Sequence, residues 1–328
     1  MPDPTTYTTI WEALTEGSPV LVTSHERLDG DGIGSALALW HALQHAGVEA
    51  LPVFQPPTPS MFDFLPGVEH NCAGTDRIPE AYNLVVIDCG NLARVGEVAG
   101  ELTDHTRLIN IDHHDSNTMF GDLNCVDPSA SSCGEMVWHL LQVAGTPLTG
   151  EIAECIFTAI VSDTGQFAHQ DTTPRAFRVC AQCVEAGARP HTLVRKLFMS
   201  PSPDQVRLRH LALGTLQFHC RGAVATMEVT EEMFNRTKLA PVDTEGFAEI
   251  PIAIRGVQAS ALLKEMPGCD FVKVSMRSGE QVDVCAVARA FGGGGHKHAA
   301  GCEIADTLPV ARDAVVQELA GQIRVATH

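Results

Sequence analysis

Short apolar runs alternate with amphipathic segments of helical length through the first half of the chain. Apolar runs of strand length occur at 19–24, 48–54, 83–90 and 107–114. Residues 35–47 and 132–145 place apolar side chains at helical spacing and end in glycine, as helices commonly do. The alternation predicts an α/β fold in which helices flank a largely parallel sheet. Residues 168–186 are predicted to be helical as well.

The second half is predicted to form a separate, smaller α/β domain. The segment 187–204 holds three prolines and is the best candidate for a linker. Strand-like segments and a final amphipathic helix follow at 224–230, 249–266, 270–278 and 308–323. We therefore expect a first domain at 1–186 and a second at 205–328.

The composition fits a compact protein and excludes some partners. Hydrophobic residues make up 45% of the 328 residues, enough for two cores. The net charge of −18 argues against a protein that coats long duplex nucleic acid, so phosphate groups must be held by local positive charge, such as metal ions or a few arginines. The 11 cysteines, including the C-x-x-C pair Cys180 and Cys183, lie in apolar stretches and are typical of buried thiols in a reducing compartment.

The N-terminal segment is polar and acidic, without the basic start and apolar core of a secretory signal. The chain also lacks an apolar run of the roughly 18 residues that cross a bilayer. We therefore expect a cytoplasmic protein that does not associate with membranes.

Acidic residues and histidines follow the apolar runs of the first half. The clusters are His25/Asp29/Asp31, Asp88, Asp112/His113/His114 and Asp163. The carboxyl ends of parallel strands share one edge of a sheet, where ligands bind, so these side chains should meet there. Carboxylates so crowded would repel one another unless divalent cations lie among them.

Six of these side chains suffice for two metal ions: His25, Asp29, Asp31, Asp88, His113 and Asp163. Two adjacent ions can activate a water and clamp a phosphate, and Asp88, alone on its strand, is the predicted bridge. Histidine and aspartate without cysteine suit Mn²⁺, with Mg²⁺, Co²⁺ or Zn²⁺ as alternatives. Each cluster alone also has a structural explanation, since Asp-Gly pairs form turns and Asp88 could cap a helix. The glycines of residues 30–35 do not have the dinucleotide-binding spacing.

Five motifs carry a resemblance to a known family. SHERLDGDGIGS (24–35), VVIDCG (85–90), IDHHDSN (111–117) and SDTGQF (162–167) resemble, in order and spacing, the four motifs of the DHH phosphoesterases. GGGGHKHAAG (292–301) resembles the signature of the DHHA1 domain that often follows. The resemblance implies one metal ion held by His25, Asp29 and Asp88. It implies a second ion held by Asp31, Asp88, His113 and Asp163.

The resemblance also implies roles at the substrate. His114 should face the substrate phosphate, with Asp88 and Asp112 completing the catalytic group. The nucleotide end of the substrate should be bound by five residues of the second domain: Arg277, Ser278, Gly294, Gly295 and His296. The active site is expected in the cleft between the two domains. Arg94, six residues after Asp88, is expected near the same sheet edge, where it touches a phosphate or forms a surface salt bridge.

The length and motifs resemble a stand-alone subgroup that acts on nanoRNA, 3′-phosphoadenosine 5′-phosphate (pAp) or cyclic dinucleotides. We therefore expect two Mn²⁺ ions and hydrolysis of short RNAs to mononucleotides, together with dephosphorylation of pAp. The resemblance implies RNAs of about two to five nucleotides, and the acidic surface is consistent with such short substrates. The family also implies a homodimer. The alternatives are a phosphodiesterase for cyclic di-AMP or pApA, a polyphosphatase, and a nucleotide-binding protein without turnover.

Overall fold

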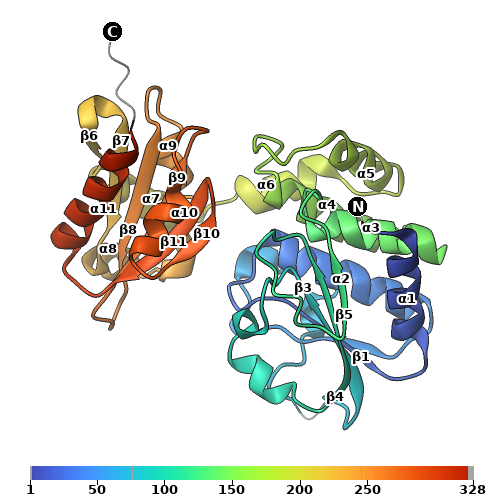
Figure 1. Ribbon diagram of the computed structural model, residues 1–328. Helices are drawn as coiled ribbons and strands as arrows, with labels where there is room; N and C mark the ends of the chain where they lie inside the picture. The colour runs from blue at the N-terminus through green and yellow to red at the C-terminus, as the bar shows by residue number, and fades with distance from the viewer. Residues whose placement is uncertain (1, 76, 245, 324–328) are drawn as a thin grey trace. The chain divides into compact units, whose positions relative to one another are not determined.

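The computed structural model describes residues 2–75, 77–244 and 246–323. These form two compact units, one ending at Ser200 and one beginning at Pro201 (Figure 1). Helix α6 (Pro190–Phe198) lies inside the segment expected to be a linker, and its Leu193 and Leu197 join the core of the first unit. The first unit therefore extends beyond residue 186.

The first unit is built on a five-stranded sheet, and four of its strands coincide with the predicted apolar runs. In spatial order the strands are β2 (Ala50–Pro52), β1 (Val20–Thr23), β3 (Tyr82–Ile87), β4 (His105–Asp112) and β5 (Leu123–Val126). Every neighbouring pair is parallel. β5 was not predicted, because Asn124 interrupts its four residues and leaves no apolar run of strand length.

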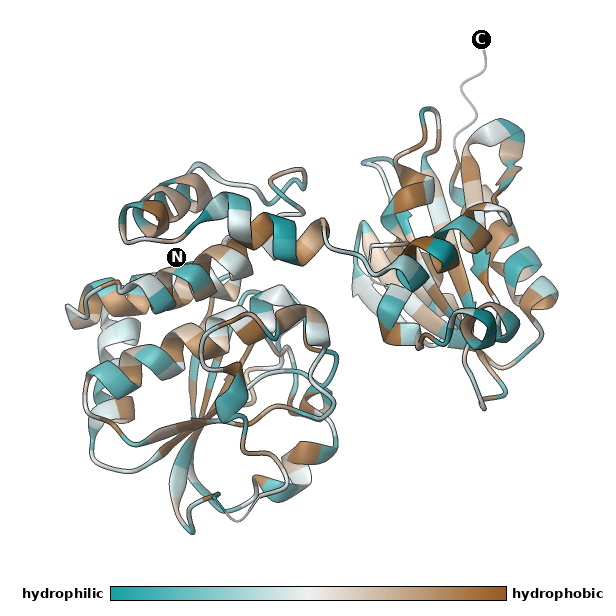
Figure 2. Cartoon of the chain, turned by 180° about the vertical axis from the view of Figure 1, so that it is seen from behind, coloured by the Kyte–Doolittle hydropathy of each residue, from teal (hydrophilic) through white to brown (hydrophobic). Residues whose placement is uncertain are grey.

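Alternate side chains of each strand enter different cores, as the pleat of a strand requires. Val20 and Val22 of β1 pack with the helices, whereas Leu21 packs on the opposite face. The strands accordingly appear mainly hydrophobic in Figure 2. The helices that contribute to the first core include α1 (Pro4–Thr15), α2 (Gly30–His45), α3 (Cys133–Ala144) and α4 (Gly150–Asp163). α5 (Pro174–Glu185) packs outside them against α4, with Cys180 and Cys183 buried.

Helix α2 begins five residues earlier than predicted, so the Asp-Gly segment is the first helical turn rather than a loop. Asp29 is its N-cap, and one oxygen of its carboxylate accepts the Gly32 N–H at 2.9 Å. A Cβ atom on Gly34 would lie only 2.6 Å from the Cys155 carbonyl oxygen of α4. Glycine at position 34 therefore allows α2 and α4 to pack closely together.

Residues 150–163 form helix α4, although the apolar run before Asp163 resembled a strand. An unbroken apolar run is compatible with a buried strand or a buried helix, and here the 14-residue length and the Thr149 cap favour the helix. Asp163 is consequently the last residue of a helix and does not end a strand, which corrects its predicted placement.

The second unit is a smaller α/β unit, as predicted. Its six-stranded sheet has the order β10 (Gly294–His296), β11 (Ala299–Ile304), β9 (Val272–Ser278), β8 (Ala259–Glu265), β7 (Val224–Val229) and β6 (Gln217–His219). β7 and β8 are parallel and the other neighbours antiparallel. One core involves α10 (Val284–Ala290) and α11 (Leu308–Gln322), the other α7 (Pro203–Leu213) and α8 (Glu231–Thr237).

The expected strand segment 249–266 contains a short helix, α9 (Glu249–Ile252), before β8. Over the described residues, the helices are too short or too polar to span a membrane.

Candidate metal centre

The carboxyl ends of β1, β3 and β4 bring acidic residues and histidines to one edge of the first sheet. His25 lies two residues beyond β1, Asp88 directly follows β3, and Asp112 ends β4. The three strands are adjacent and parallel, so these ends are neighbours. Asp163 reaches the same place from the C-terminal end of α4.

Asp88 lies at the centre of this cluster and is buried. Its Oδ2 lies 3.4 Å from His25 Nε2, and its Oδ1 lies 3.6 Å from His113 Nε2. The backbone of Asp88 has a φ of 57°, in the left-handed region that aspartate and asparagine tolerate better than most residues. Its N–H donates to the Ile111 carbonyl oxygen at 3.0 Å, which fixes this turn. The two carboxylate oxygens therefore face two different histidines.

The remaining predicted ligands divide between these histidines. In the His25 group (His25, Asp29 and Asp88), His25 Nε2 lies 3.5 Å from Asp29 Oδ2. In the His113 group (Asp31, Asp88, His113 and Asp163), His113 Nε2 lies 3.8 Å from Asp31 Oδ2 and 3.5 Å from Asp163 Oδ2. All six side chains predicted from the sequence thus come together, and Asp88 belongs to both groups.

The N-terminus of α3 fixes the carboxylate of Asp31. The backbone N–H groups of Cys133 and Gly134 donate to its two oxygens at 2.7 and 3.1 Å. Ser35, one turn further along α2, donates its hydroxyl to Oδ1 at 2.8 Å. Free N–H groups at a helix N-terminus favour an anion, so this carboxylate is held in one orientation.

Asp112 holds His114 rather than joining the two groups. Its Oδ1 lies 2.7 Å from His114 Nδ1, and its Oδ2 accepts the Asn117 amide at 2.6 Å. Asn117 has no predicted role, although it lies within the third motif of the sequence. His114 Nε2 lies 3.4 Å from Arg94 Nη1, so Arg94 reaches the site edge, as anticipated from its position after Asp88.

The charges of the two groups suit divalent cations. Burial disfavours the protonated form of His25, but Asp29 and Asp88 outweigh it and raise its pKa to about 10. His113 is likewise buried, and Asp163 and Asp31 raise its pKa to about 10. Burial, assisted by Asp88, raises the pKa of Asp31 to about 7. The cluster therefore attracts positive charge strongly.

The orientation of His113 also suits a metal ligand. Its Nδ1 lies 3.3 Å from the Ala130 carbonyl oxygen, which fixes the ring and leaves Nε2 toward the carboxylates. Imidazole nitrogens and carboxylate oxygens are the donors expected for Mn²⁺, Zn²⁺ and similar ions. These side chains therefore fit a pair of divalent cations that share Asp88.

One nearby donor was not anticipated. Cys133 Sγ lies with Asp31, Asp88 and His113 in a set of potential ligand atoms that are all within 4.8 Å of one another. Cys133 was not among the predicted ligands, and the choice of manganese stays a prediction. Cys133 begins a helix and follows no apolar run, so its spacing in the sequence gives no sign of this position.

The affinity of the centre for divalent cations is expected to rise from about pH 6 to pH 8. His25 and His113 carry protons in this range when no cation is bound, since the pKa of each is about 10. A cation must displace them, so affinity should rise about tenfold per pH unit for each proton released. Calorimetric titrations in buffers of different ionisation enthalpy would count the protons. The His25→Gln variant should release about one proton fewer when a cation binds. An affinity for cations that does not depend on pH would contradict the expectation.

The predicted nucleotide-binding residues cluster on one edge of the second sheet. Arg277 of β9 and His296 of β10 both pair with Ala299 of β11, from opposite sides. Gly294 and Gly295 precede His296 on the exposed strand β10. Arg277 Nε donates to Glu249 Oε1 at 2.8 Å, a partner that was not predicted.

Ser278 makes local contacts next to Arg277. Its hydroxyl donates to the Val282 carbonyl oxygen at 2.7 Å and lies 3.2 Å from His298 Nδ1. These contacts orient the turn after β9, beside the Gly-rich strand. The structure therefore groups the five residues, and their binding role stays a prediction.

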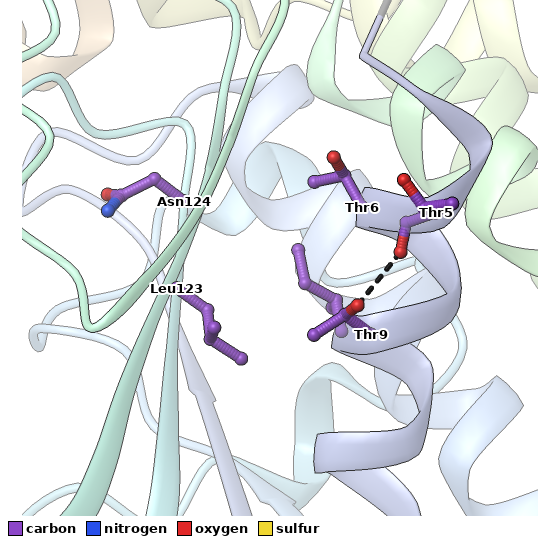
Figure 3. Close-up of a pocket in the computed structure, with 6 residues that line it drawn as sticks. Thr5, Thr6, Thr9, Leu123 and Asn124 are labelled. Atoms are coloured by element: carbon purple, nitrogen blue, oxygen red, sulfur yellow. Dashed lines mark hydrogen bonds between the residues drawn. The ribbon is translucent and has the colours of Figure 1, made fainter.

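A shallow hollow elsewhere in the first unit has no reactive groups. It lies between α1 and the start of β5 and is shown in Figure 3. Its lining is Thr5, Thr6, Thr9, Ile10, Leu123 and Asn124. Leu123 pairs with Ile109, three residues before the end of β4 at Asp112. The hollow is therefore separate from the acidic edge of the sheet.

Comparisons with known proteins agree with this architecture. The DHH family, N-terminal domain, matches residues 19–160, and the DHHA1 domain matches residues 223–324. A Thermus thermophilus protein named bifunctional oligoribonuclease and PAP phosphatase NrnA is 35% identical over 286 residues, which cover 87% of this chain and 84% of that protein. The Bacillus subtilis protein of the same name is 27% identical, covering 87% and 89%.

A solved structure shares the whole fold. The exopolyphosphatase-related protein from Bacteroides fragilis superposes with a TM-score of 0.88 at 24% identity, covering 97% of this chain and 96% of that one. The two matched domains, the extended identity to the Thermus protein and the His/Asp cluster at the expected sheet edge agree with one another. The chain therefore belongs to the DHH/DHHA1 family, in its NrnA-like subgroup.

Proposed function

We propose that this protein is a dinuclear metal phosphoesterase that hydrolyses short oligoribonucleotides to mononucleotides and removes phosphate from pAp, in the cytoplasm. The observation that carries the proposal is the position of Asp88, whose two oxygens face the histidines of two separate ligand groups. The names of the Thermus and Bacillus relatives support the same pair of activities. Mn²⁺ is the proposed metal, with Mg²⁺ or Co²⁺ as alternatives.

The two groups would divide the metal ions as their geometry suggests. His25, Asp29 and Asp88 would hold one ion, and Asp31, Asp88, His113 and Asp163 the other. Such a pair supplies an activated water and neutralises the charge of the phosphate. The N–H groups of α3 keep Asp31 oriented while the ions are bound.

His114 and Arg94 would act on the phosphate directly. Asp112 holds His114 Nδ1, which leaves Nε2 as the atom for proton exchange with the leaving oxygen. Arg94 lies beside that nitrogen and can donate to the phosphoryl oxygens. Both residues come from the same edge as the ligands, so they are suitably placed to stabilise the charge that develops during hydrolysis.

The second unit would bind the nucleotide. Consecutive glycines of β10 leave backbone N–H groups accessible, and Arg277 lies two strands away on the same edge. These features suit a nucleotide, with its base and phosphate, rather than inorganic polyphosphate. The cleft between the two domains stays a prediction.

A turnover assay with Mn²⁺ tests the proposal. A 5′-labelled RNA trimer, pAp, cyclic di-AMP and polyphosphate would be offered in parallel, with and without chelator, and His113→Ala would serve as the inactive control. Chelator-sensitive loss of trimer and pAp is expected. Turnover of cyclic di-AMP or polyphosphate alone would replace the proposed substrate class. If the wild-type protein binds two ions per molecule but hydrolyses none of the four substrates, the proposed enzymatic activity is wrong.

Replacing Arg277 by alanine is expected to raise KM for pAp about tenfold while leaving kcat nearly unchanged, because an arginine contact to phosphate contributes chiefly to binding. Steady-state kinetics of the variant would measure the two constants. Glu249→Gln is the matched control, since it removes the negative charge beside Arg277 but keeps the guanidinium and an oxygen that can accept from it. An unchanged KM in Arg277→Ala would remove this residue from the nucleotide site.

A further inference from the structure

The His113 group contains a sulfur atom in addition to its oxygen and nitrogen donors. Cys133 is the first residue of α3 and is fully buried. Its Sγ lies 3.9 Å from Asp88 Oδ1, the oxygen that also faces His113. Ligand atoms bound to one ion are separated by comparable distances, because each lies about 2.0–2.3 Å from the metal.

We propose that Cys133 supplies a thiolate ligand to a cation held by Asp31, Asp88 and His113, and that it gives this position a preference for soft divalent ions such as Zn²⁺ and Cd²⁺ over Mg²⁺. The inference rests on the proposed dinuclear centre and concerns one of its two positions. The His25 group has histidine and aspartate donors and lacks a described cysteine, so the two positions should differ in selectivity.

The backbone of Cys133 makes the placement firm. Its N–H donates to Asp31 Oδ2 at 2.7 Å, so the residue is tied to one of the ligands that it would join. Sγ also lies 3.7 Å from the Ile111 carbonyl oxygen, at the end of β4. A backbone contact and a thiol contact from different elements therefore hold Cys133 beside Asp88 in the metal-free protein, and coordination would replace the thiol contact.

Coordination exchanges one bond for another. The S–H bond breaks, a sulfur–metal bond forms, and the proton passes to solvent, with no change of oxidation state. Thiolate is a soft donor, so the gain is large for Zn²⁺ or Cd²⁺ and small for Mg²⁺. A soft ion at this position would gain one extra protein ligand and lose one open position for water or phosphate. Zn²⁺ should therefore bind more tightly than Mn²⁺ and support slower turnover.

Cobalt titration tests the inference by a spectroscopic signal. The metal-free protein would be titrated with Co²⁺, and a sulfur-to-cobalt charge-transfer band in the near ultraviolet should grow until one equivalent is bound. Cys133→Ser and Cys133→Ala should lack the band and lose about tenfold in Zn²⁺ affinity relative to Mn²⁺. Both variants retain the backbone N–H that holds Asp31, and thermal unfolding would verify that they fold.

Cys155→Ala is the matched control, because Cys155 is a buried cysteine of the same unit that lies outside the ligand groups. It should keep the band. A wild-type chain that binds two cobalt ions without the band, or Cys133 variants that retain it, would overturn the inference and leave the proposed function intact. A wild-type chain that binds no ions would overturn both.

Discussion

Replacing Asp88 by asparagine is expected to lower kcat/KM by at least about 10³-fold, since metal ions contribute several kcal/mol to transition-state stabilisation. The amide has one oxygen and one NH₂ group, so it can face His25 or His113 as an acceptor but not both. The variant should bind one cation fewer than the wild type. Calorimetry would give the stoichiometry, and the pAp assay would give the rate.

Asparagine is the informative substitution at this position. Asp88 has a left-handed backbone with a φ of 57°, which asparagine also tolerates, so the turn after β3 should survive. Asp63→Asn, an exposed aspartate outside the ligand groups, is the matched control and should behave as wild type. An Asp88→Asn variant with two bound ions and ordinary turnover would show that the two positions do not share this ligand.

Replacing Asp112 by asparagine is expected to lower kcat about 100-fold, as for other residues that orient a catalytic group. Asp112 accepts from His114 and Asn117 with its two oxygens, and an amide can accept with only one. His114 therefore loses the charged partner of its Nδ1, and it also loses its orientation where the amide turns its NH₂ group toward that nitrogen. Rapid kinetics of pAp hydrolysis would measure the loss in kcat.

The number of bound metal ions distinguishes an Asp112 that orients His114 from an Asp112 that coordinates a metal ion directly. Asp112→Asn should still bind two cations with nearly wild-type affinity, and KM should change little. Asn117→Ala removes one donor to Asp112 but leaves the contact with His114, so its loss in kcat should be smaller. Loss of a bound ion in Asp112→Asn would make Asp112 a ligand instead, in keeping with the set of Asp88, Asp112 and His114.

Much of the first unit could be predicted because most of its strands are short, apolar and largely buried. The ends of β1, β3 and β4 differ by at most two residues from the ends of the predicted runs, except that β3 ends three residues earlier than predicted. A parallel sheet then places the ends of these strands side by side, whatever the details of the loops. The meeting of His25, Asp88 and Asp112 therefore follows from topology alone.

Other parts depended on packing that periodicity does not record. Asp163 was assigned to the end of a strand, since a continuous apolar run has no period that distinguishes a buried helix. β10 consists of Gly294 to His296, all exposed, and its pairing is decided by its neighbour β11. Cys133 reaches the site through helix geometry and has no characteristic spacing in the sequence. Asn117 belongs to the third motif, but its role depends on a loop contact with Asp112 that the motif does not specify.

The ligands of the centre are distributed over β1 with α2, β3, β4 and α4, so the centre exists only when all of these segments have docked. Early, partly folded chains cannot hold the ions with the full ligand set. Cations should therefore add little to the rate at which the chain folds and act mainly by slowing its unfolding. In a cell short of the metal, the protein would still be made and would still fold, but each molecule would survive for less time before it opened to proteolysis.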